Sequence, residues 1–235
     1  MLELASLSRA FGGLVVIDQL SFKVEKGEIV GILGPNGAGK TTLFNMIAGV
    51  LPPSSGRIWF EQSDVTAMKA WHRCRLGIGR TYQIPKPFTH MSVFENVLAA
   101  AVHGGKMPLA LAKEEAEKVL VRVGLARCAH VPAGRLALLD MKQLELAKAL
   151  ALRPRLLLLD EIAGGLTEAE CDLLIGTIAQ VHRDGVTIVW IEHVIQALHR
   201  VVTRLAVLAG GNFIAVGSPH DVLADQRVKD AYLGT

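Results

Sequence analysis

The residues from Gly34 to Thr42 are the part of this sequence best suited to chemistry. They read Gly34-Pro35-Asn36-Gly37-Ala38-Gly39-Lys40-Thr41-Thr42 and fit the phosphate-binding pattern G-x-x-x-x-G-K-[ST]. Glycines let successive backbone N–H groups turn towards phosphate oxygens, and the N-terminus of a following helix adds positive potential. We expect Lys40 to reach the β- and γ-phosphates of a nucleotide and the Thr41 hydroxyl to ligate Mg²⁺.

The flanking residues supply the context that such a loop requires. The apolar run from Glu28 to Leu33 is typical of a buried strand, and Leu43 to Ala48 predicts a helix that stops near Gly49. Because strand, glycine loop and helix follow in that order, a chance glycine-rich loop is a poor explanation of the match.

Two adjacent carboxylates follow a second apolar run. Residues 155–159 show no alternation, as expected for a strand buried on both faces, and Asp160 and Glu161 come directly after them. Ligands bind at the carboxyl ends of strands in open α/β sheets. Asp160 would hold Mg²⁺, directly or through water, and Glu161 would polarise the water that attacks the γ-phosphate. Two acids alone could merely cap a helix; the upstream loop favours the functional interpretation.

Two further side chains are candidates by position. His193 follows the apolar run 187–191 by way of Glu192, where an imidazole could hydrogen-bond the γ-phosphate and help hold the water. A lone histidine is more often structural. Gln83 precedes Pro85, so it lies in a loop, and its amide oxygen could touch both Mg²⁺ and water. On spacing alone, a solvated loop glutamine is the simpler interpretation.

Hydrophobic patterning predicts the elements that must position these residues. Short β-like runs at 2–4, 15–17, 20–24 and 57–61 indicate an antiparallel layer, and further strands are expected at 204–208 and 213–216. From about residue 88 to 152 helical signals dominate: a helix opened by the Ser92–Glu95 capping box and ended by Gly104-Gly105, a second over 113–123, and a third over 141–152. A second capping box, Thr167–Glu170, predicts a helix of about four turns, and Ser218-Pro219 predicts a short one.

Composition narrows the functional classes. The chain has 235 residues, 51% of them hydrophobic, and a net charge of +3, which does not favour a nucleic-acid binder. No apolar run reaches the roughly 20 residues that cross a bilayer, and Glu3 stands where a signal peptide would be basic, so we expect an intracellular protein. Cys74, Cys128 and Cys171 fit no metal spacing and are expected to be reduced thiols.

Taken in order along essentially the whole chain, these motifs resemble an ATP-binding cassette (ABC) ATPase, the nucleotide-binding subunit of ABC transporters. The resemblance implies an α/β P-loop NTPase (RecA-like) core with an N-terminal antiparallel β layer and an inserted helical subdomain. One ABC domain would span 1–235, with core and β layer at 1–87 and 153–235 and the helical subdomain at about 88–152. It implies ATP and Mg²⁺ as cofactors, Phe11 stacking on adenine, Gln83 as catalytic residue and metal ligand, and His193 as the switch histidine.

Local sequence resembles the ATPases of branched-chain amino acid importers in four places: 80–83, 91–97, 144–150 and the ending 228–234. This implies transmembrane permease subunits as partners, a second ABC ATPase subunit as homo- or heterodimer partner, an extracytoplasmic solute-binding protein acting indirectly, and no nucleic acid. The chain would lie peripherally on the cytoplasmic face of the inner (plasma) membrane. The solute stays open among amino acids, amides and urea.

The chain departs from that family where the signature LSGGQ is expected. It reads Leu136-Ala137-Leu138-Leu139-Asp140, and it also has Ile162, Thr167 and Val194 in place of a proline, an aspartate and an acid. In the family, the signature of one subunit contacts the γ-phosphate held by the other, so we hypothesise an asymmetric dimer. This chain would bind and cleave ATP when a partner supplies a good signature, and the site that it completes itself would be weak.

Alternative functions remain beside the importer. An ATPase of a lipid or lipopolysaccharide exporter shares close cassette similarity, and the altered signature is compatible with a poorly hydrolysing regulatory subunit. A soluble ABC protein of DNA repair or translation would usually carry two cassettes or a long coiled-coil insertion, and this sequence has neither.

Overall fold

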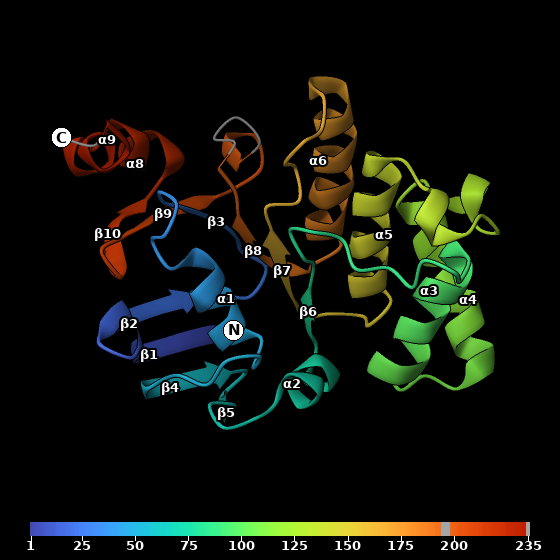
Figure 1. Ribbon diagram of the computed structural model, residues 1–235, viewed down its shortest axis with the longest axis horizontal. Helices are drawn as coiled ribbons and strands as arrows, with labels where there is room; N and C mark the ends of the chain where they lie inside the picture. The colour runs from blue at the N-terminus through green and yellow to red at the C-terminus, as the bar shows by residue number, and fades with distance from the viewer. Residues whose placement is uncertain (194–197, 234–235) are drawn as a thin grey trace. The chain divides into compact units, whose positions relative to one another are not determined.

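The computed structural model describes residues 1–193 and 198–233, which form two compact units (Figure 1). The first unit joins Met1–Arg73 to Thr187–Thr235, and the second is Cys74–Val186. No helix among the described residues is long and apolar enough to span a bilayer.

The first unit contains an antiparallel sheet with the strand order β2-β1-β4-β5. Its strands are β1 (Leu2–Phe11), β2 (Leu14–Val24), β4 (Ser55–Phe60) and β5 (Ser63–Asp64). The antiparallel β layer is therefore confirmed, but the short runs predicted at 2–4, 15–17 and 20–24 belong to two long strands. Register shifts in the β1–β2 pair and left-handed backbone at Ser6 and Gln19 interrupt the alternation, which explains the fragmented sequence pattern.

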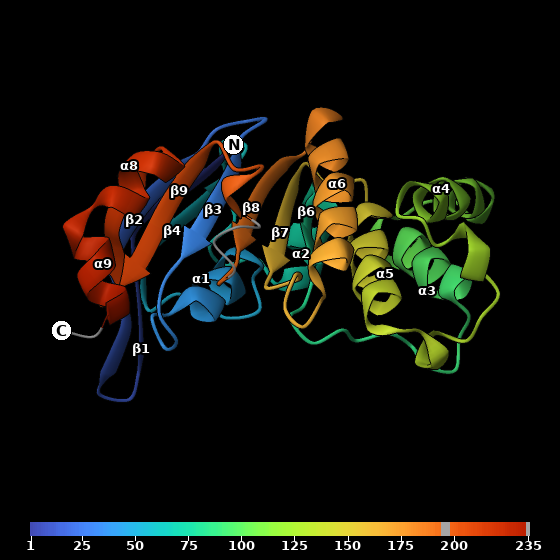
Figure 2. The same cartoon turned by 90° about the horizontal axis from the view of Figure 1, so that it is seen from above.

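The same unit holds the strand that leads into the phosphate loop. β3 (Ile29–Leu33) pairs in parallel with β8 (Thr187–Ile191) on one side and β9 (Arg204–Ala209) on the other, and β10 (Asn212–Gly217) is antiparallel to β9. Every residue of β3 is buried, as its unbroken apolar run predicts. The helices described in this unit include α1 (Lys40–Ile47), α8 (Pro219–Ala224) and α9 (Gln226–Leu233). Both α8 and α9 contact β10, and α8 also contacts β9 (Figure 2).

The second unit pairs β6 (Ile78–Arg80) in parallel with β7 (Leu156–Asp160). Its helices are α3 (Val93–Ala99), continued by a π-helical turn at Ala100–Gly104, α4 (Leu109–Arg122), α5 (Leu138–Leu150) and α6 (Glu168–Arg183), with single 3₁₀ turns at Ala126–Cys128 and Ala133–Arg135. Helices α3, α4 and α5 contact one another. They occupy the segment predicted to be a helical subdomain, and that subdomain boundary stays a prediction.

Both capping boxes are confirmed, at Ser92 before α3 and at Thr167 before α6. α5 begins three residues earlier than its predicted start at 141. Within residues 1–193 and 198–233, two α-helices were not predicted: α9, and α2 (Ala70–Leu76), which spans the boundary between the units. The buried residue of α2 is an arginine rather than an apolar side chain, so its sequence lacks the usual apolar stripe.

Candidate functional site

The phosphate loop lies between β3 and α1 and is closed over the Lys40 side chain. The buried Lys40 ammonium donates hydrogen bonds to the carbonyl oxygens of Gly34 (2.7 Å) and Pro35 (3.1 Å). The N–H of Ala38 donates to the Pro35 carbonyl at 3.2 Å, which tightens the turn. A loop that wraps a lysine at the start of a helix has the form that cradles phosphate oxygens.

Two glycines of the loop are required by the packing around them. A Cβ on Gly34 would lie 2.3 Å from the Leu208 carbonyl oxygen, which is backbone and cannot yield. Gly39 has φ +99°, and a Cβ there would lie 2.8 Å from the Ile17 side chain. The loop therefore sits tightly between β9 and β2, and the G-x-x-x-x-G spacing has a structural reason as well as a chemical one.

Phe11 lies at the tip of the β1–β2 hairpin, where it pairs with Leu14. Its ring is 45% exposed, and the Arg9 guanidinium lies 4.7 Å from the ring centroid. The neighbouring strand β2 touches the phosphate loop, since the Val16 carbonyl oxygen would lie 3.0 Å from a Cβ on Gly39. The β1–β2 hairpin therefore packs against the phosphate loop and carries an exposed aromatic residue at its tip.

His193 follows β8 at the same edge of the sheet as the phosphate loop. β8 runs parallel to β3, and the Glu192 N–H donates to the Ile32 carbonyl at 3.3 Å, so both strands end side by side. The His193 side chain is 55% exposed, with Nδ1 3.7 Å from Glu192 Oε2. Glu192, which is fully buried, also accepts a hydrogen bond from the His193 N–H at 3.1 Å. Val194 lies outside the described residues.

In the second unit the structure brings Gln83 and Glu161 together. The Gln83 Nε2 donates to Glu161 Oε2 at 2.5 Å, although the residues are 78 positions apart. This arrangement turns the amide nitrogen of Gln83 towards the carboxylate. Glu161 has φ +44°, a left-handed conformation that is strained for a side chain of this size. Strained backbone of this kind is concentrated at functional sites.

Lys142 of α5 fixes the two main chains that carry this pair. Its buried ammonium donates to the carbonyl oxygen of Gln83 at 2.7 Å and to that of Glu161 at 3.4 Å. One buried cation therefore holds both backbones in place. Sequence analysis missed Lys142 because the contact joins three segments that are distant in the chain.

Asp160 is held by the residues that end the neighbouring strand β6. Arg80 Nη2 lies 2.8 Å from Asp160 Oδ2, and the two side chains are only 8% and 5% exposed. The Asp160 N–H donates to the Thr81 hydroxyl at 3.2 Å. Both contacts escaped sequence analysis, which treated Arg80 and Thr81 only as part of a local resemblance.

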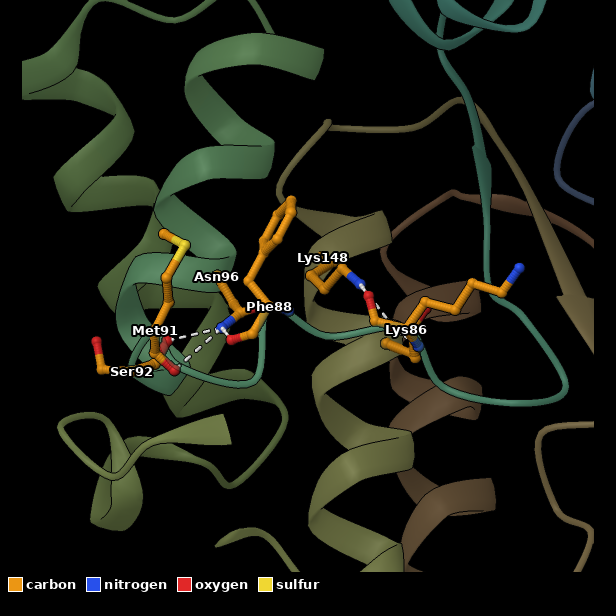
Figure 3. A network of polar contacts seen from close by, with 7 residues as sticks. Lys86, Phe88, Met91, Ser92, Asn96 and Lys148 are labelled. Atoms are coloured by element: carbon orange, nitrogen blue, oxygen red, sulfur yellow. Dashed lines mark hydrogen bonds and ion pairs between the residues drawn. The ribbon is translucent and has the colours of Figure 1, made fainter. Parts of the chain in front are cut away.

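The segment from Gln83 to Ser92 has no regular structure but is tied through its backbone (Figure 3). The Lys86 N–H donates to the Glu145 carboxylate at 2.8 Å, and Lys148 donates to the Lys86 carbonyl at 2.7 Å. Farther along, buried Asn96 accepts from the Phe88 N–H at 2.8 Å and donates to the Phe88 carbonyl at 3.1 Å. Helices α5 and α3 therefore hold the segment that begins at Gln83.

The segment that stands in the signature position starts α5. Ala137 is its N-cap and makes no side-chain capping bond, while Leu138 is 43% exposed and its side chain lies 3.2 Å from a Cβ position on Gly165. Asp140 in the first turn pairs with Arg127. The helix start therefore offers no hydroxyl at position 137 and carries an exposed apolar side chain at position 138.

The proposed metal donors are hard oxygen atoms: the Thr41 hydroxyl, the Gln83 amide oxygen and the Asp160 carboxylate. Within the described parts of the chain, no cluster of three or more His, Cys, Asp or Glu could hold a metal ion by itself. Mg²⁺ takes only one or two carboxylates from a protein and completes its octahedron with phosphates and water. Each of these donors is therefore of the type that Mg²⁺ takes from a protein when it is bound with a nucleotide.

Comparisons with known proteins identify the family. The ABC transporter profile matches residues 17–164, and a profile described as branched-chain amino acid ATP-binding cassette transporter matches residues 214–235. The chain is 33% identical to the lipopolysaccharide export system ATP-binding protein of Acidithiobacillus ferridurans, covering 100% of this chain and 97% of the relative. It is also 33% identical to the high-affinity branched-chain amino acid transport ATP-binding protein of Pseudomonas aeruginosa, covering 100% and 98%.

Among solved structures, the chain is similar to a nucleotide-free ATP-binding cassette from an ABC transporter. The TM-score is 0.92 at 30% identity, over 100% of this chain and 99% of that one. The ADP conformation of such a cassette gives a TM-score of 0.91 at 30% identity, over the same shares. These full-length matches confirm the P-loop NTPase fold. The chain belongs to the ATP-binding cassette family of ABC transporter subunits, which bind ATP and hydrolyse it to power transport.

Proposed function

We propose that this subunit energises the import of branched-chain amino acids or related amides. The observation that carries the proposal is the match of residues 214–235 to the branched-chain cassette profile. Full-length similarity to the branched-chain amino acid transport protein of Pseudomonas aeruginosa supports it. In this proposal the chain lies peripherally on the cytoplasmic face of the inner membrane, bound to transmembrane permease subunits that receive solute from an extracytoplasmic binding protein.

In the proposed reaction, residues of the first unit bind the nucleotide. The backbone N–H groups of residues 34–42 cradle the phosphates, and Lys40 exchanges its contacts with the Gly34 and Pro35 carbonyls for phosphate oxygens. The Phe11 ring stacks on adenine. His193 hydrogen-bonds the γ-phosphate, with its ring oriented by the buried Glu192 carboxylate.

Residues of the second unit would act on water and metal. Mg²⁺, when bound, would neutralise part of the negative charge of the nucleotide phosphates. Thr41, Gln83 and Asp160 are the residues that would hold it. Glu161 accepts a proton from the attacking water as general base, and its hydrogen bond to Gln83 keeps the carboxylate oriented.

We further infer that the functional dimer pairs two different ATPase subunits. Ala137 and the exposed Leu138 at the start of α5 support this, because neither supplies the polar contact that a partner-held γ-phosphate requires. Loss of one such donor costs about 3 kcal/mol of transition-state stabilisation when it acts like an oxyanion-hole group. A different subunit with an intact signature would complete the site at this chain's own phosphate loop.

A second candidate function is an ATPase of a lipopolysaccharide exporter, which the 33% identity to the Acidithiobacillus ferridurans protein favours. The two candidates differ in the membrane proteins that they require. Export would need permeases that extract lipid and would show no dependence on a soluble solute-binding protein.

Co-purification from native membranes followed by reconstitution separates these functions. We expect the tagged chain to bring down two permeases and a second ATPase, and proteoliposomes of that complex to accumulate labelled leucine when ATP and the binding protein are present. A complex with a Lys40→Ala chain is the matched control and should accumulate no leucine. Recovery of lipid-exporter membrane subunits, with no leucine, amide or urea uptake, would contradict the import proposal.

A further inference from the structure

The ion pair between Arg80 and Asp160 is unusual because it neutralises a carboxylate that the proposed reaction assigns to a metal. The strands β6 and β7 run parallel, with Arg80 in register with Leu158, so the Arg80 side chain reaches two residues farther along, to Asp160 at the end of β7. Arg80 Nη2 and Asp160 Oδ2 are 2.8 Å apart, and both side chains are buried.

A buried carboxylate needs a compensating charge or a full set of hydrogen bonds. Arg80 supplies that charge, while the Thr81 hydroxyl accepts the hydrogen bond from the Asp160 N–H. The charge of Asp160 is therefore balanced by a residue of the chain itself. A metal bound at the same carboxylate would lie within a few ångströms of the guanidinium, and like charges at that distance in a buried site repel strongly.

Arg80 has a second partner that would remain if the Asp160 contact were lost. Its guanidinium carbon lies 5.1 Å from the Tyr82 ring centroid, a cation–π distance, and Lys86 Nζ lies 5.0 Å from the same centroid. The aromatic ring lies on the segment that runs from Arg80 to Gln83. Movement of Arg80 towards Tyr82 would therefore act directly on the backbone that carries Gln83.

We propose that Arg80 is the counter-ion of Asp160 in the metal-free protein and that the divalent cation of the bound nucleotide takes over this role. This inference rests on the proposed assignment of Asp160 as a metal ligand. Arg80 then acts as a positioning residue: it keeps the carboxylate oriented before binding and lowers its affinity for a metal that arrives without nucleotide. When metal binds to Asp160, Arg80 is released towards Tyr82. Metal binding therefore acts on the segment from Gln83 to Ser92, which is hydrogen-bonded to α5 and α3 (Figure 3).

The decisive quantity is the contribution of metal to nucleotide affinity. We would measure by calorimetry the affinity of the isolated chain for the non-hydrolysable analogue adenylyl imidodiphosphate, once with Mn²⁺ and once with EDTA. The ratio of the two affinities gives the factor by which the metal strengthens nucleotide binding. We expect Arg80→Met, which keeps side-chain length but removes charge, to raise this ratio at least tenfold over wild type. Arg80→Lys is the matched control and should stay within threefold.

A stability measurement adds a readout that needs no nucleotide. Arg80→Met leaves the Asp160 carboxylate buried without Arg80, so its Tm in EDTA should fall, whereas the double variant Arg80→Met/Asp160→Asn should recover part of that loss. If Arg80→Met does not fold, Arg80→Gln, which keeps a donor but no charge, carries the affinity test.

The outcomes separate the inference from the proposed function. A ratio for Arg80→Met or Arg80→Gln equal to or below that of wild type would overturn the competition between Arg80 and metal. That result leaves the metal assignment standing, provided that wild type still binds nucleotide more tightly with Mn²⁺ than with EDTA. If Mn²⁺ does not strengthen binding to wild type and Asp160→Asn changes nothing, the proposed metal role of Asp160 fails instead.

Discussion

At the scale of single residues, sequence predicted the groups to which we assign chemistry, but not the residues that hold them in place. The loop 34–42 and the pair Asp160–Glu161 carry recognisable types at fixed spacing, so both were predictable. Arg80 and Lys142 reach their partners across 80 and 59 positions, and no local pattern encodes such contacts. Glu192, read only as a link to His193, proves to be fully buried.

The general base can be tested by one substitution. Glu161→Gln should lower ATP turnover by about 10²- to 10⁴-fold, because an amide cannot accept a proton from water. Nucleotide affinity should stay the same, because glutamine has nearly the same shape as glutamate. Turnover by phosphate release and affinity by titration are measured side by side. Turnover within twofold of wild type would remove Glu161 from the reaction.

Arg73 is a buried residue to which we assign no functional role. Its guanidinium donates to four carbonyl oxygens, those of Met46 (2.6 Å), Ile47 (2.8 Å), Thr66 (2.9 Å) and Met68 (3.0 Å). Desolvation by burial lowers its pKa to about 10, only partly opposed by Asp64, so the cation stays charged at neutral pH.

Replacing Arg73 should therefore destabilise the fold. We expect Arg73→Met to lower the free energy of unfolding by about 3 kcal/mol. The substitution leaves buried carbonyl groups, among them those in the last turn of α1, without their hydrogen-bond donor. Urea denaturation measures the change. Arg75→Met is the control, since Arg75 lies exposed in the same helix and its loss should cost under about 0.5 kcal/mol.

At the scale of elements, capping chemistry was the most reliable signal and strand continuity the least. The Ser92 and Thr167 boxes fix the starts of α3 and α6 because each is a complete local hydrogen-bond arrangement. β1 and β2 could not be read as long strands because bulges shift their register. α9 was missed because it lies in a short polar tail whose contacts are with β10 and α8.

The capping boxes also predict an acid dependence of stability. The backbone N–H and the hydroxyl of Ser92 lower the pKa of Glu95 below its ordinary value of 4.5. A carboxylate with a lowered pKa in the folded state stabilises the fold above 4.5 and loses that contribution as the pH falls through the folded value. Glu95→Gln should therefore flatten the loss of Tm below pH 4.5.

The matched comparison is Glu114→Gln, at an exposed position within α4. In this variant, Tm should fall with decreasing pH as steeply as it does in wild type. Equal curves for Glu95→Gln and wild type between neutral and acid pH would show that the box does not contribute through its ionised carboxylate.

At the scale of the whole molecule, the two compact units divide the proposed machinery between them. The first holds the phosphate loop, Phe11 and His193, and the second holds Gln83, Asp160 and Glu161. Each group is held by hydrogen bonds within its own unit, through Lys40 in the first and through Lys142 and Arg80 in the second. No pattern within one chain shows which partner completes a site, and residues 136–140 are the one place where sequence predicted that dependence.

Restoring the signature tests the proposed asymmetry of the dimer. The triple change Ala137→Ser/Leu138→Gly/Leu139→Gly should raise turnover at the partner's site by about a hundredfold, the equivalent of a regained contact of about 3 kcal/mol. Turnover per site is counted with the other site blocked by a Lys40→Ala change or its counterpart. No gain at the partner's site, or equal fast hydrolysis at both sites before the change, would rule the asymmetry out.

The most direct test of the account is titration of the chain with ATP in the presence of Mg²⁺. Wild type should show saturable binding at one site per chain, and Lys40→Ala should weaken it at least a hundredfold because the buried ammonium no longer meets the phosphates. Lys26→Ala, an exposed lysine of the same unit, should bind as wild type does. Absence of saturable binding by wild type, or unchanged affinity in Lys40→Ala, would contradict the account.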